Sequence, residues 1–306
     1  LGRVTIKGVS LGTAGVFVIS LLYGAFFYGN LTDALKNAEI ASNGLKIVEN
    51  LGLVFFVTSV GFIAGPKFFK NLKKNFKSYI LLGAAIILTG GVTCAICYFI
   101  GRGSANNPQE FIALMDGLLS GSLTTTPGFS AAKETVKNVY AATPELAGEY
   151  EAAVTVGYGI AYLFGVIGVV LFVQIMPKLV HADMDLERKK LASVDLGTVK
   201  AKAENLIDID DMGLGAFGMA ALIGLVVGNI KIPLTSAGLS GTCFSLTTTG
   251  GALITALVFG HFSHIGKINI MPPKKTLECL RELGLMIFLI GAGVAGGANF
   301  VKYFKP

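Results

Sequence analysis

The sequence has no tryptophan and little charge. Asp, Glu, Lys and Arg together make up 14% of the 306 residues, whereas soluble domains have roughly 25%. Hydrophobic residues make up 53%, and the mean hydropathy is +0.67. The scarcity of charge argues against a soluble domain and indicates a membrane protein. Because tryptophan is absent, we expect tyrosine, lysine and arginine to anchor the chain at the membrane surfaces.

Residues that would indicate an enzyme or a cofactor site are also scarce. Cys94 and Cys97 form a C-x-x-C pattern, but both lie inside the apolar run 79–100 and no second pair follows. We interpret them as small buried side chains. The three histidines lack a metal-binding spacing, and no nucleotide-binding loop, nucleophile elbow or catalytic dyad is present. The sequence therefore predicts no cofactor, no metal site and no enzymatic activity, and an intramembrane enzyme or a channel is the least favoured alternative.

Seven apolar stretches are long enough to cross a bilayer as helices, which takes about 17–25 residues. The predicted fold class is therefore all-α, in a polytopic membrane protein. The segment 110–138 differs from the seven, because its apolar parts are too short to span alone and a polar run separates them. The seven stretches cover residues 9–29, 45–65, 79–100, 153–177, 212–228, 243–262 and 279–300.

Loop charges orient these stretches. Segment 66–78 has five lysines and no acid, and 178–211 is also basic, so both are predicted to be cytoplasmic. The loop 133–152 has four glutamates against two lysines, which favours the outside. These assignments of loops to the two sides of the membrane are consistent only if segment 110–138 enters and leaves on the outer face. We therefore expect a re-entrant or broken helix there. The net charge of +6 lies in a few loops, and no nucleic-acid partner is predicted.

The segment 120–130, SGSLTTTPGFS, carries the candidate substrate site. It is poor helix material, and broken backbone at membrane depth is tolerated only where it is buried in protein or lines a cavity. Two half-helices that meet at a break expose backbone N–H groups and a positive helix end, and hydroxyl groups add donors for an anion. The alternative is a polar turn that only closes a loop. The residues predicted to bind substrate here are Ser120, Ser122, Thr124, Thr125, Thr126, Pro127, Gly128 and Ser130.

Polar residues near span ends supply further candidates. Arg281 either pairs bidentately with a substrate carboxylate or forms an interfacial pair with Glu282 at the helix end. Asn50 opens the equivalent span and joins the predicted substrate-binding residues. Asp116, near the start of the re-entrant element, is either a helix cap or a cation contact. The sequence SLTTTGG at 245–251 echoes SLTTTPG at 122–128, but the flanks do not align and we interpret the echo as coincidental.

An internal repeat relates the two parts of the chain. Residues 45–53 (LKIVENLGL) align without gaps with 277–285 (LECLRELGL). Five crossings separate the copies, and an odd number inverts the second copy, as in many secondary transporters. We predict a first repeat over 1–178, a cytoplasmic linker over 179–211 and a second repeat over 212–306, in a chain that is incomplete at both ends. Further matched pairs are Leu21 with Leu257, Gly24 with Gly260, Phe56 with Phe288, Gly61 with Gly293 and Gly65 with Gly297.

Four of these sequences resemble motifs of the aspartate–alanine exchanger family of bacterial membrane transporters. They are SGSLTTTPGFSAA at 120–132, YGIAYLFGVIG at 158–168, NLGL at 50–53 and RELGL at 281–285. The resemblance implies a multi-pass secondary transporter of the bacterial inner membrane that exchanges small anionic metabolites, such as aspartate and alanine or dicarboxylates such as succinate. The expected partners are the anionic substrate and membrane lipids, with a homodimer left open. The alternative is a sodium- or proton-coupled symporter or antiporter of an organic anion.

Overall fold

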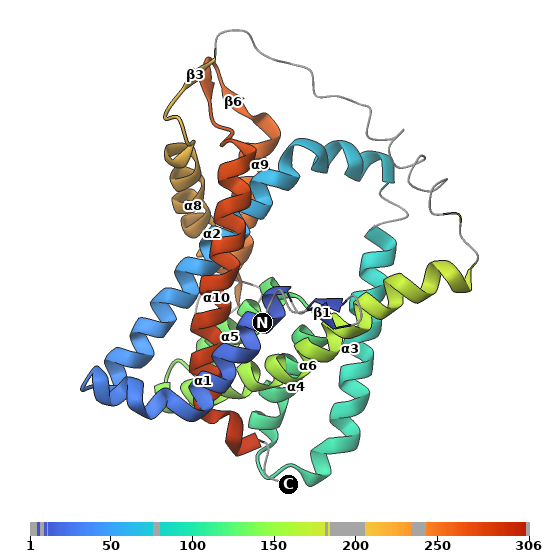
Figure 1. Cartoon of the computed structure of the whole chain (residues 1–306), viewed down its shortest axis with the longest axis vertical. Helices are drawn as coiled ribbons and strands as arrows, with labels where there is room; N and C mark the ends of the chain where they lie inside the picture. Colours follow the sequence, from blue (N-terminus) through green and yellow to red (C-terminus); the bar gives the residue numbers. More distant parts are fainter. Residues whose placement is uncertain are drawn as a thin grey trace.

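The described residues fold into long helices joined by short turns and three small sheets (Figure 1). The computed structural model describes residues 5–6, 9–10, 12–75, 80–180, 183, 206–233 and 243–303. The expected linker 179–211 lies largely outside this part. Of the expected basic loop 66–78, residues 66–75 instead continue helix α2, and residues 76–78 lie outside the described part. The helices are α1 (Gly12–Ala34), α2 (Ala38–Asn75), α3 (Leu81–Gly101), η2 (Arg102–Ser104), α4 (Pro108–Ser122), α5 (Thr126–Val139), α6 (Pro144–Leu179), α8 (Leu214–Gly228), α9 (Thr247–Phe262) and α10 (Lys274–Tyr303).

The strands are short and lie at helix ends. Antiparallel β1 (Thr5–Ile6) and β2 (Val9–Ser10) precede α1, and antiparallel β4 (Ile232–Pro233) and β5 (Cys243–Phe244) precede α9. The matched helices α1 and α9 are thus each preceded by a strand pair. A third sheet joins the start of α8 to the turn between α9 and α10; it consists of β3 (Ile207–Asp208), β7 (Ile268–Asn269) and β6 (His264–Ile265). Because each of these strands has only two residues and the rest of the described regular structure is helical, the all-α prediction is confirmed.

Among the described residues, four helices are long and apolar enough to cross a membrane. They contain the segments Gly15–Ala34, Glu39–Pro66, Leu81–Ser104 and Lys274–Gly297. The predicted spans 212–228 and 243–262 differ, because α8 and α9 have 15 and 16 residues. At 1.5 Å per residue such helices reach about 23 Å, short of the roughly 30 Å hydrocarbon core. As helices they are thus shorter than a full crossing.

Helices α2 and α10 pack antiparallel and form the centre of the molecule. A Cβ atom placed on Gly52 would lie 2.7 Å from the carbonyl oxygen of Gly284, and one placed on Gly284 would lie 2.7 Å from that of Gly52. These glycines are equivalent in the repeat alignment. Equivalent residues that face each other on antiparallel helices define a two-fold axis perpendicular to both helices, which is the relation expected of an inverted repeat.

The matched helices pack crosswise between the repeats, α1 on α10 and α9 on α2. Gly65 of α2 lies against the backbone of Leu257 in α9, and its counterpart Gly297 of α10 lies against the backbone of Leu21 in α1. Leu21 and Leu257 are themselves matched in the sequence alignment. Such close approach of helix backbones is typical of small residues at membrane helix interfaces. The two copies are therefore interlocked through α2 and α10.

Helices α4 and α5 form a hairpin that returns to the side on which it starts. Gly117 lies against Val154 of α6, and further along Gly165 of α6 lies against Ser122, with its added Cβ 2.6 Å from the Ser122 carbonyl oxygen. Sequence numbers rise together in these contacts, so α4 and α6 are parallel. Since α5 runs between them, it must bring the chain back. This is the arrangement of the re-entrant element expected at 110–138.

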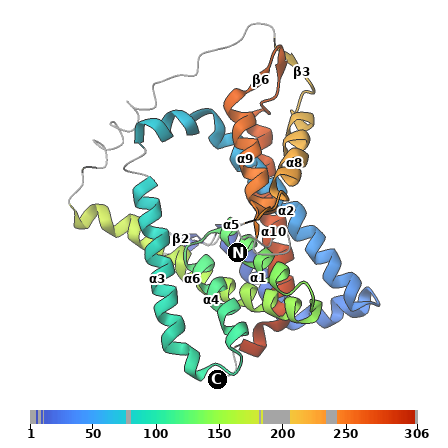
Figure 2. The same cartoon turned by 180° about the vertical axis from the view of Figure 1, so that it is seen from behind.

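Helices α8 and α9 form a second hairpin at the other end of the molecule. Gly224 lies against Ala252, and Gly228 lies against Thr247, so the two helices are antiparallel with their tip at β4 and β5. Figures 1 and 2 show α8 and α9 towards the end of α10 that carries β3 and β6, whereas α4 and α5 lie towards the opposite end. The two hairpins approach the centre from opposite directions.

Candidate functional site

The polar run forms a turn between α4 and α5, as the sequence predicts. Thr124 has a backbone φ of 50°, in the left-handed region that β-branched residues rarely adopt. Its N–H donates to the carbonyl oxygen of Gly121 at 2.9 Å, which ends α4. Pro127 sits in the first turn of α5, where the missing N–H costs no hydrogen bond. The break therefore leaves a new helix N-terminus inside the protein.

The hydroxyl groups of the predicted site have different surroundings. Thr125 is the N-cap of α5, and its Oγ1 accepts the N–H of Gly128 at 3.2 Å. Thr126 follows and is buried. Ser120 and Ser122 instead donate to carbonyl oxygens within α4, at 2.9 Å in both cases. The structure thus places the threonines at the N-terminus of α5, while the two serines are engaged along α4.

Tyr158 of α6 lies against this helix start. Its ring stacks on that of Phe129 with centroids 4.2 Å apart, and an edge of Phe17 from α1 meets it at 5.5 Å. The side chain is fully buried, and among the described residues its hydroxyl makes no hydrogen bond of accepted geometry, although Thr126 lies beside it. A buried hydroxyl without a partner costs free energy. Tyr158 was part of a family motif in the sequence, but nothing there indicated that it meets the break.

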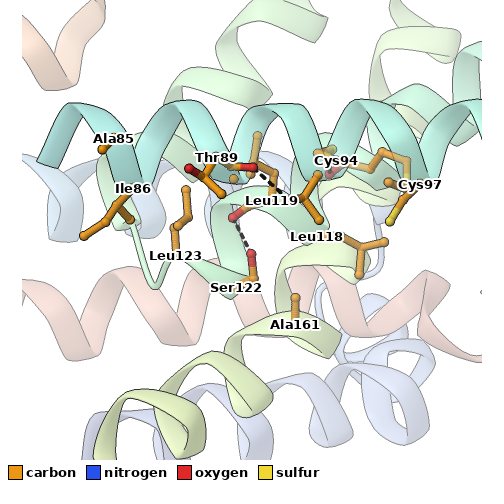
Figure 3. Close-up of a pocket in the computed structure, with 13 residues that line it drawn as sticks. Ala85, Ile86, Thr89, Cys94, Cys97, Leu118, Leu119, Ser122, Leu123 and Ala161 are labelled. Carbon is orange, nitrogen blue, oxygen red and sulfur yellow. Dashed lines mark hydrogen bonds between the residues drawn. The ribbon is translucent and has the colours of Figure 1, made fainter. Parts of the chain in front are cut away.

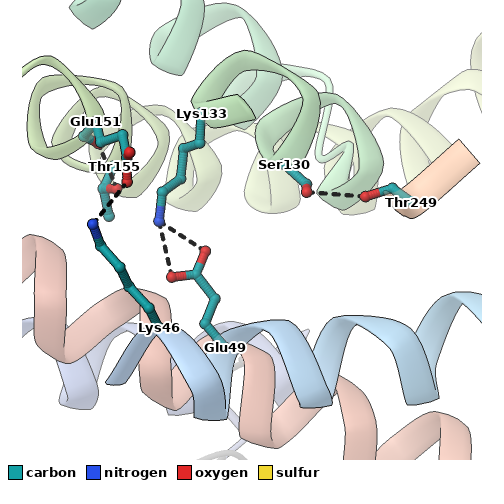
Figure 4. Close-up of polar contacts among 7 residues, drawn as sticks. All are labelled: Lys46, Glu49, Ser130, Lys133, Glu151, Thr155 and Thr249. Carbon is teal, nitrogen blue, oxygen red and sulfur yellow. Dashed lines mark hydrogen bonds and ion pairs between the residues drawn. The ribbon is translucent and has the colours of Figure 1, made fainter. Parts of the chain in front are cut away.

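A buried ion pair joins α5 to α2. The Lys133 ammonium lies 2.8 Å from both carboxylate oxygens of Glu49, and the two side chains are 12% and 8% exposed (Figure 4). Lys133 Nζ also lies 5.5 Å from the centre of the Phe129 ring, so the side chain points back towards the break. Sequence reasoning missed Lys133, because it was counted with an outer loop. The missed signal is a lysine seven residues after the break.

The two hairpins touch through a pair of hydroxyl groups. Thr249 of α9 donates to Ser130 of α5 at 2.9 Å (Figure 4). Thr247, which opens α9, has a φ of 61°, as Thr124 does at 50°. The two similar sequences around these threonines thus occupy hairpin tips that meet, although they are not equivalent in the repeat. The interpretation of the echo as coincidental overlooked this contact.

Arg281 and Asn50 are not brought to the break. Arg281 pairs with its neighbour Glu282 at 3.7 Å, the partner named in the second alternative, and has a side chain that is 39% exposed. Asn50 is exposed on α2, whereas the preceding Glu49 points inward. Asp116 lies in the middle of α4 and is exposed, and the N-cap of that helix is Asn107. The helix-cap interpretation of Asp116 is therefore wrong.

The C-x-x-C pattern lies beside an apolar groove between α3 and α4. The groove has a volume of about 700 Å³, and its lining includes Cys94, Cys97, Leu119 and Ala161 (Figure 3). Cys94 is half-buried and Cys97 is exposed, so the prediction that both are buried is wrong. The reason is that α3 contacts the rest of the molecule along one face only, and its apolar residues point outward. In the described residues no cluster of three or more His, Cys, Asp or Glu could hold a metal ion.

Comparison with known proteins identifies the group to which these hairpins and helices belong. The family model Asp-Al_Ex, described as Predicted Permease Membrane Region, matches residues 1–178 and 216–306. This chain belongs to the Asp-Al_Ex family. It is a membrane protein of a permease family, in agreement with the resemblance seen in the sequence. No solved structure matches it.

Named relatives of this Asp-Al_Ex protein are described as transporters. It is 34% identical over 192 residues to the uncharacterized transporter BF2680 of Bacteroides fragilis, covering 62% of this chain and 30% of that protein. It is 31% identical over 237 residues to an uncharacterized transporter of Bacteroides thetaiotaomicron, covering 76% and 38%. It is 35% identical over 193 residues to the uncharacterized transporter GSU1016 of Geobacter sulfurreducens, covering 62% and 31%. The chain thus spans about a third of the length of the curated relatives it matches.

Proposed function

We propose that this Asp-Al_Ex protein is a secondary active transporter that exchanges small anionic metabolites across the bacterial inner membrane by alternating access. The substrates are amino acids of the aspartate and alanine type or dicarboxylates such as succinate. The observation that carries the proposal is the α4–α5 break, where a helix N-terminus capped by Thr125 lies inside the protein beside Thr126 and the buried hydroxyl of Tyr158.

Anion binding follows from the chemistry of this arrangement. Of the first three residues of α5, Pro127 has no N–H and Gly128 donates its N–H to Thr125 Oγ1, which leaves the N–H of Thr126. The helix dipole favours negative charge at this helix start. Thr126 and Tyr158 add hydroxyl donors, and Lys133 places a cation on the same helix, one turn beyond Phe129. A carboxylate accepts several hydrogen bonds at once, so this set of donors suits it better than a neutral solute.

Alternating access is supported by the approach of the hairpins from opposite ends. The α4–α5 tip and the α8–α9 tip are joined by the hydrogen bond between Ser130 and Thr249. A substrate at this junction is separated from each side of the membrane by one hairpin. Movement of one hairpin at a time would open the junction to one side and then to the other, as in transporters whose broken helices meet near the bilayer midplane.

Counterflow in proteoliposomes tests the proposal. Vesicles preloaded with unlabelled aspartate, alanine or succinate should take up the same labelled anion transiently, and vesicles without preload should not. Repeating the uptake with and without a sodium or proton gradient separates exchange from ion coupling. Absence of counterflow for every anion tested, with correctly folded protein, would refute the proposed function.

A further inference from the structure

We propose that Glu49 is an internal counter-ion that takes the place of the substrate carboxylate on Lys133, so that the Glu49–Lys133 pair locks the unloaded carrier. The inference rests on the proposed exchange function and explains why exchange would be favoured over net transport. It concerns two residues that come together from positions 84 residues apart in the sequence.

The position of the pair is central to the molecule. Glu49 lies one turn before Gly52, the residue at which α2 crosses α10. In an inverted repeat the two-fold axis lies in the plane of the membrane, near the midplane. Glu49 is therefore placed close to the middle of the bilayer, where ionisable side chains are expensive and usually functional.

Lys133 faces the candidate substrate site rather than an outer surface. Its ammonium lies 5.5 Å from the centre of the Phe129 ring, and that ring stacks on Tyr158, which borders the start of α5. Ser130, one turn before Lys133, carries the contact to α9. The cation thus belongs to the same helix face that meets the second hairpin.

A buried lysine needs a carboxylate in every state of the carrier. Removing one partner of a buried ion pair leaves an uncompensated charge, which is strongly unfavourable. Glu49 meets the need when no substrate is bound, because both of its oxygens lie 2.8 Å from the Lys133 ammonium. A substrate carboxylate offers the same chemistry, so the two anions compete for one cation.

The competition has a mechanical consequence, because the partners belong to different elements. Glu49 is on α2, which is packed against α9 and α10, whereas Lys133 is on the α4–α5 hairpin. While the pair is formed, the hairpin is tied to α2. A substrate that takes over Lys133 releases the tie, so the loaded carrier reorients readily and the unloaded one does not. A ligand shifts a conformational equilibrium only through such differential contacts.

A second ion pair on α2 provides a matched control. Lys46, one turn before Glu49, lies 3.7 Å from Glu151 of α6, and its side chain is 45% exposed (Figure 4). This pair has the same residue types, but its N–O distance is longer and its lysine is more exposed. It links α2 to α6 instead of to the hairpin. Its removal should change stability without changing the balance between exchange and net transport.

The test compares net efflux into substrate-free buffer with counterflow in proteoliposomes. Glu49→Gln should raise the ratio of net efflux to counterflow by about tenfold or more, since a ligand-free reorientation no longer has to break a charged pair. Lys46→Gln with Glu151→Gln should leave the ratio unchanged. A Glu49→Gln protein that exchanges normally with the wild-type ratio would overturn the inference, and so would a wild-type protein in which net efflux is already as fast as counterflow.

The charge swap Glu49→Lys with Lys133→Glu keeps the test decisive if Glu49→Gln folds poorly. If the pair is only structural, the swap should restore both the folded yield and counterflow, and this result would overturn the inference. If Lys133 binds the substrate carboxylate, the swap should restore the folded yield but not counterflow. If the proposed exchange function itself is wrong, the wild-type protein should show no counterflow with any anion. This result differs from failure of the inference about Glu49, in which the wild-type protein still exchanges.

Discussion

Gly52 and Gly284 hold equivalent positions in the two repeats and pack directly against each other, backbone to backbone. Neither position has room for a side chain, because a Cβ atom on either glycine would lie 2.7 Å from the carbonyl oxygen of the other. The contact brings the axes of α2 and α10 together at the centre of the inverted repeat. It also places Glu49, one turn away, beside the α4–α5 hairpin.

Replacing Gly52 by alanine should destabilise the protein, because backbone atoms of α10 would have to move. Overpacking of this kind costs about 1–3 kcal/mol. Gly44→Ala on the same helix is the control, since nothing lies within 4 Å of a Cβ atom there. We expect Gly44→Ala to be neutral or stabilising by up to about 1 kcal/mol. Thermal unfolding in detergent measures both, and equal melting temperatures for the two variants would contradict the packing described for α2 and α10.

The threonines at the start of α5 should respond differently to loss of their hydroxyl groups. Thr125→Val removes the N-cap that accepts the Gly128 N–H, and it should lower stability by about 0.5–2 kcal/mol, whereas Thr125→Ser should not. Thr126→Val should leave stability nearly unchanged but weaken substrate binding by roughly ten- to a hundred-fold, the value of one hydrogen bond to a charged group at about 1.5–3 kcal/mol. Affinity from concentration-dependent counterflow and melting temperature separate the two effects. Unchanged affinity in Thr126→Val would remove Thr126 from the site.

Arg281→Lys should leave counterflow within about twofold of wild type. Arg281 is 39% exposed and pairs with Glu282 at 3.7 Å, and an exposed pair of this kind contributes about 0–1 kcal/mol. Lysine retains the positive charge that pairs with Glu282. A large loss of transport in Arg281→Lys, with normal folded yield, would instead show that the planar guanidinium binds a carboxylate. The double change Arg281→Gln with Glu282→Gln separates the two cases. If Arg281 only pairs with Glu282, removing both charges should leave transport near normal. If Arg281 binds substrate, transport should stay low.

The start of α8 should be sensitive to acid through Asp210. The backbone N–H groups of Gly215 and Leu214 donate to its carboxylate at 2.7 and 2.9 Å, and these bonds, that of Gly215 first, hold the pKa of Asp210 below its ordinary value. A lowered pKa in the folded state gives stability that is present above the ordinary aspartate pKa of about 3.9. This stability is lost as the pH falls further, through the folded-state pKa.

Asp210→Ala should therefore lower the melting temperature at neutral pH, and the difference from wild type should shrink as the pH falls below about 4. Asp211→Ala is the control for loss of a neighbouring carboxylate. A difference between Asp210→Ala and wild type that stays constant from neutral to acidic pH would mean that the charge of Asp210 has no part in holding the start of α8.

Much of the architecture can be predicted from local patterns in the sequence. Hydropathy identifies the long helices α1, α2, α3 and α10, because the bilayer requires about 20 apolar residues in a row. The break between α4 and α5 follows from consecutive threonines and a Pro-Gly step, and the loop charges predict its return to one side. The gapless alignment of Gly52 with Gly284 reveals the inverted repeat. Each of these signals depends on neighbours in the chain or on a pattern that recurs along it.

The contacts within the candidate site were decided by tertiary structure alone. Lys133 meets Glu49 across 84 residues of sequence, and Ser130 meets Thr249 across 119. No periodicity or motif specifies such a pair. The partner of a side chain depends on which helices pack together and on how they are shifted along their axes. Helices α8 and α9 look like spans in the sequence, but with 15 and 16 residues they form an antiparallel hairpin shorter than a full crossing. The sequence determined a membrane protein with a broken helix and two related halves, and helix packing determined which charges and hydroxyl groups meet at its centre.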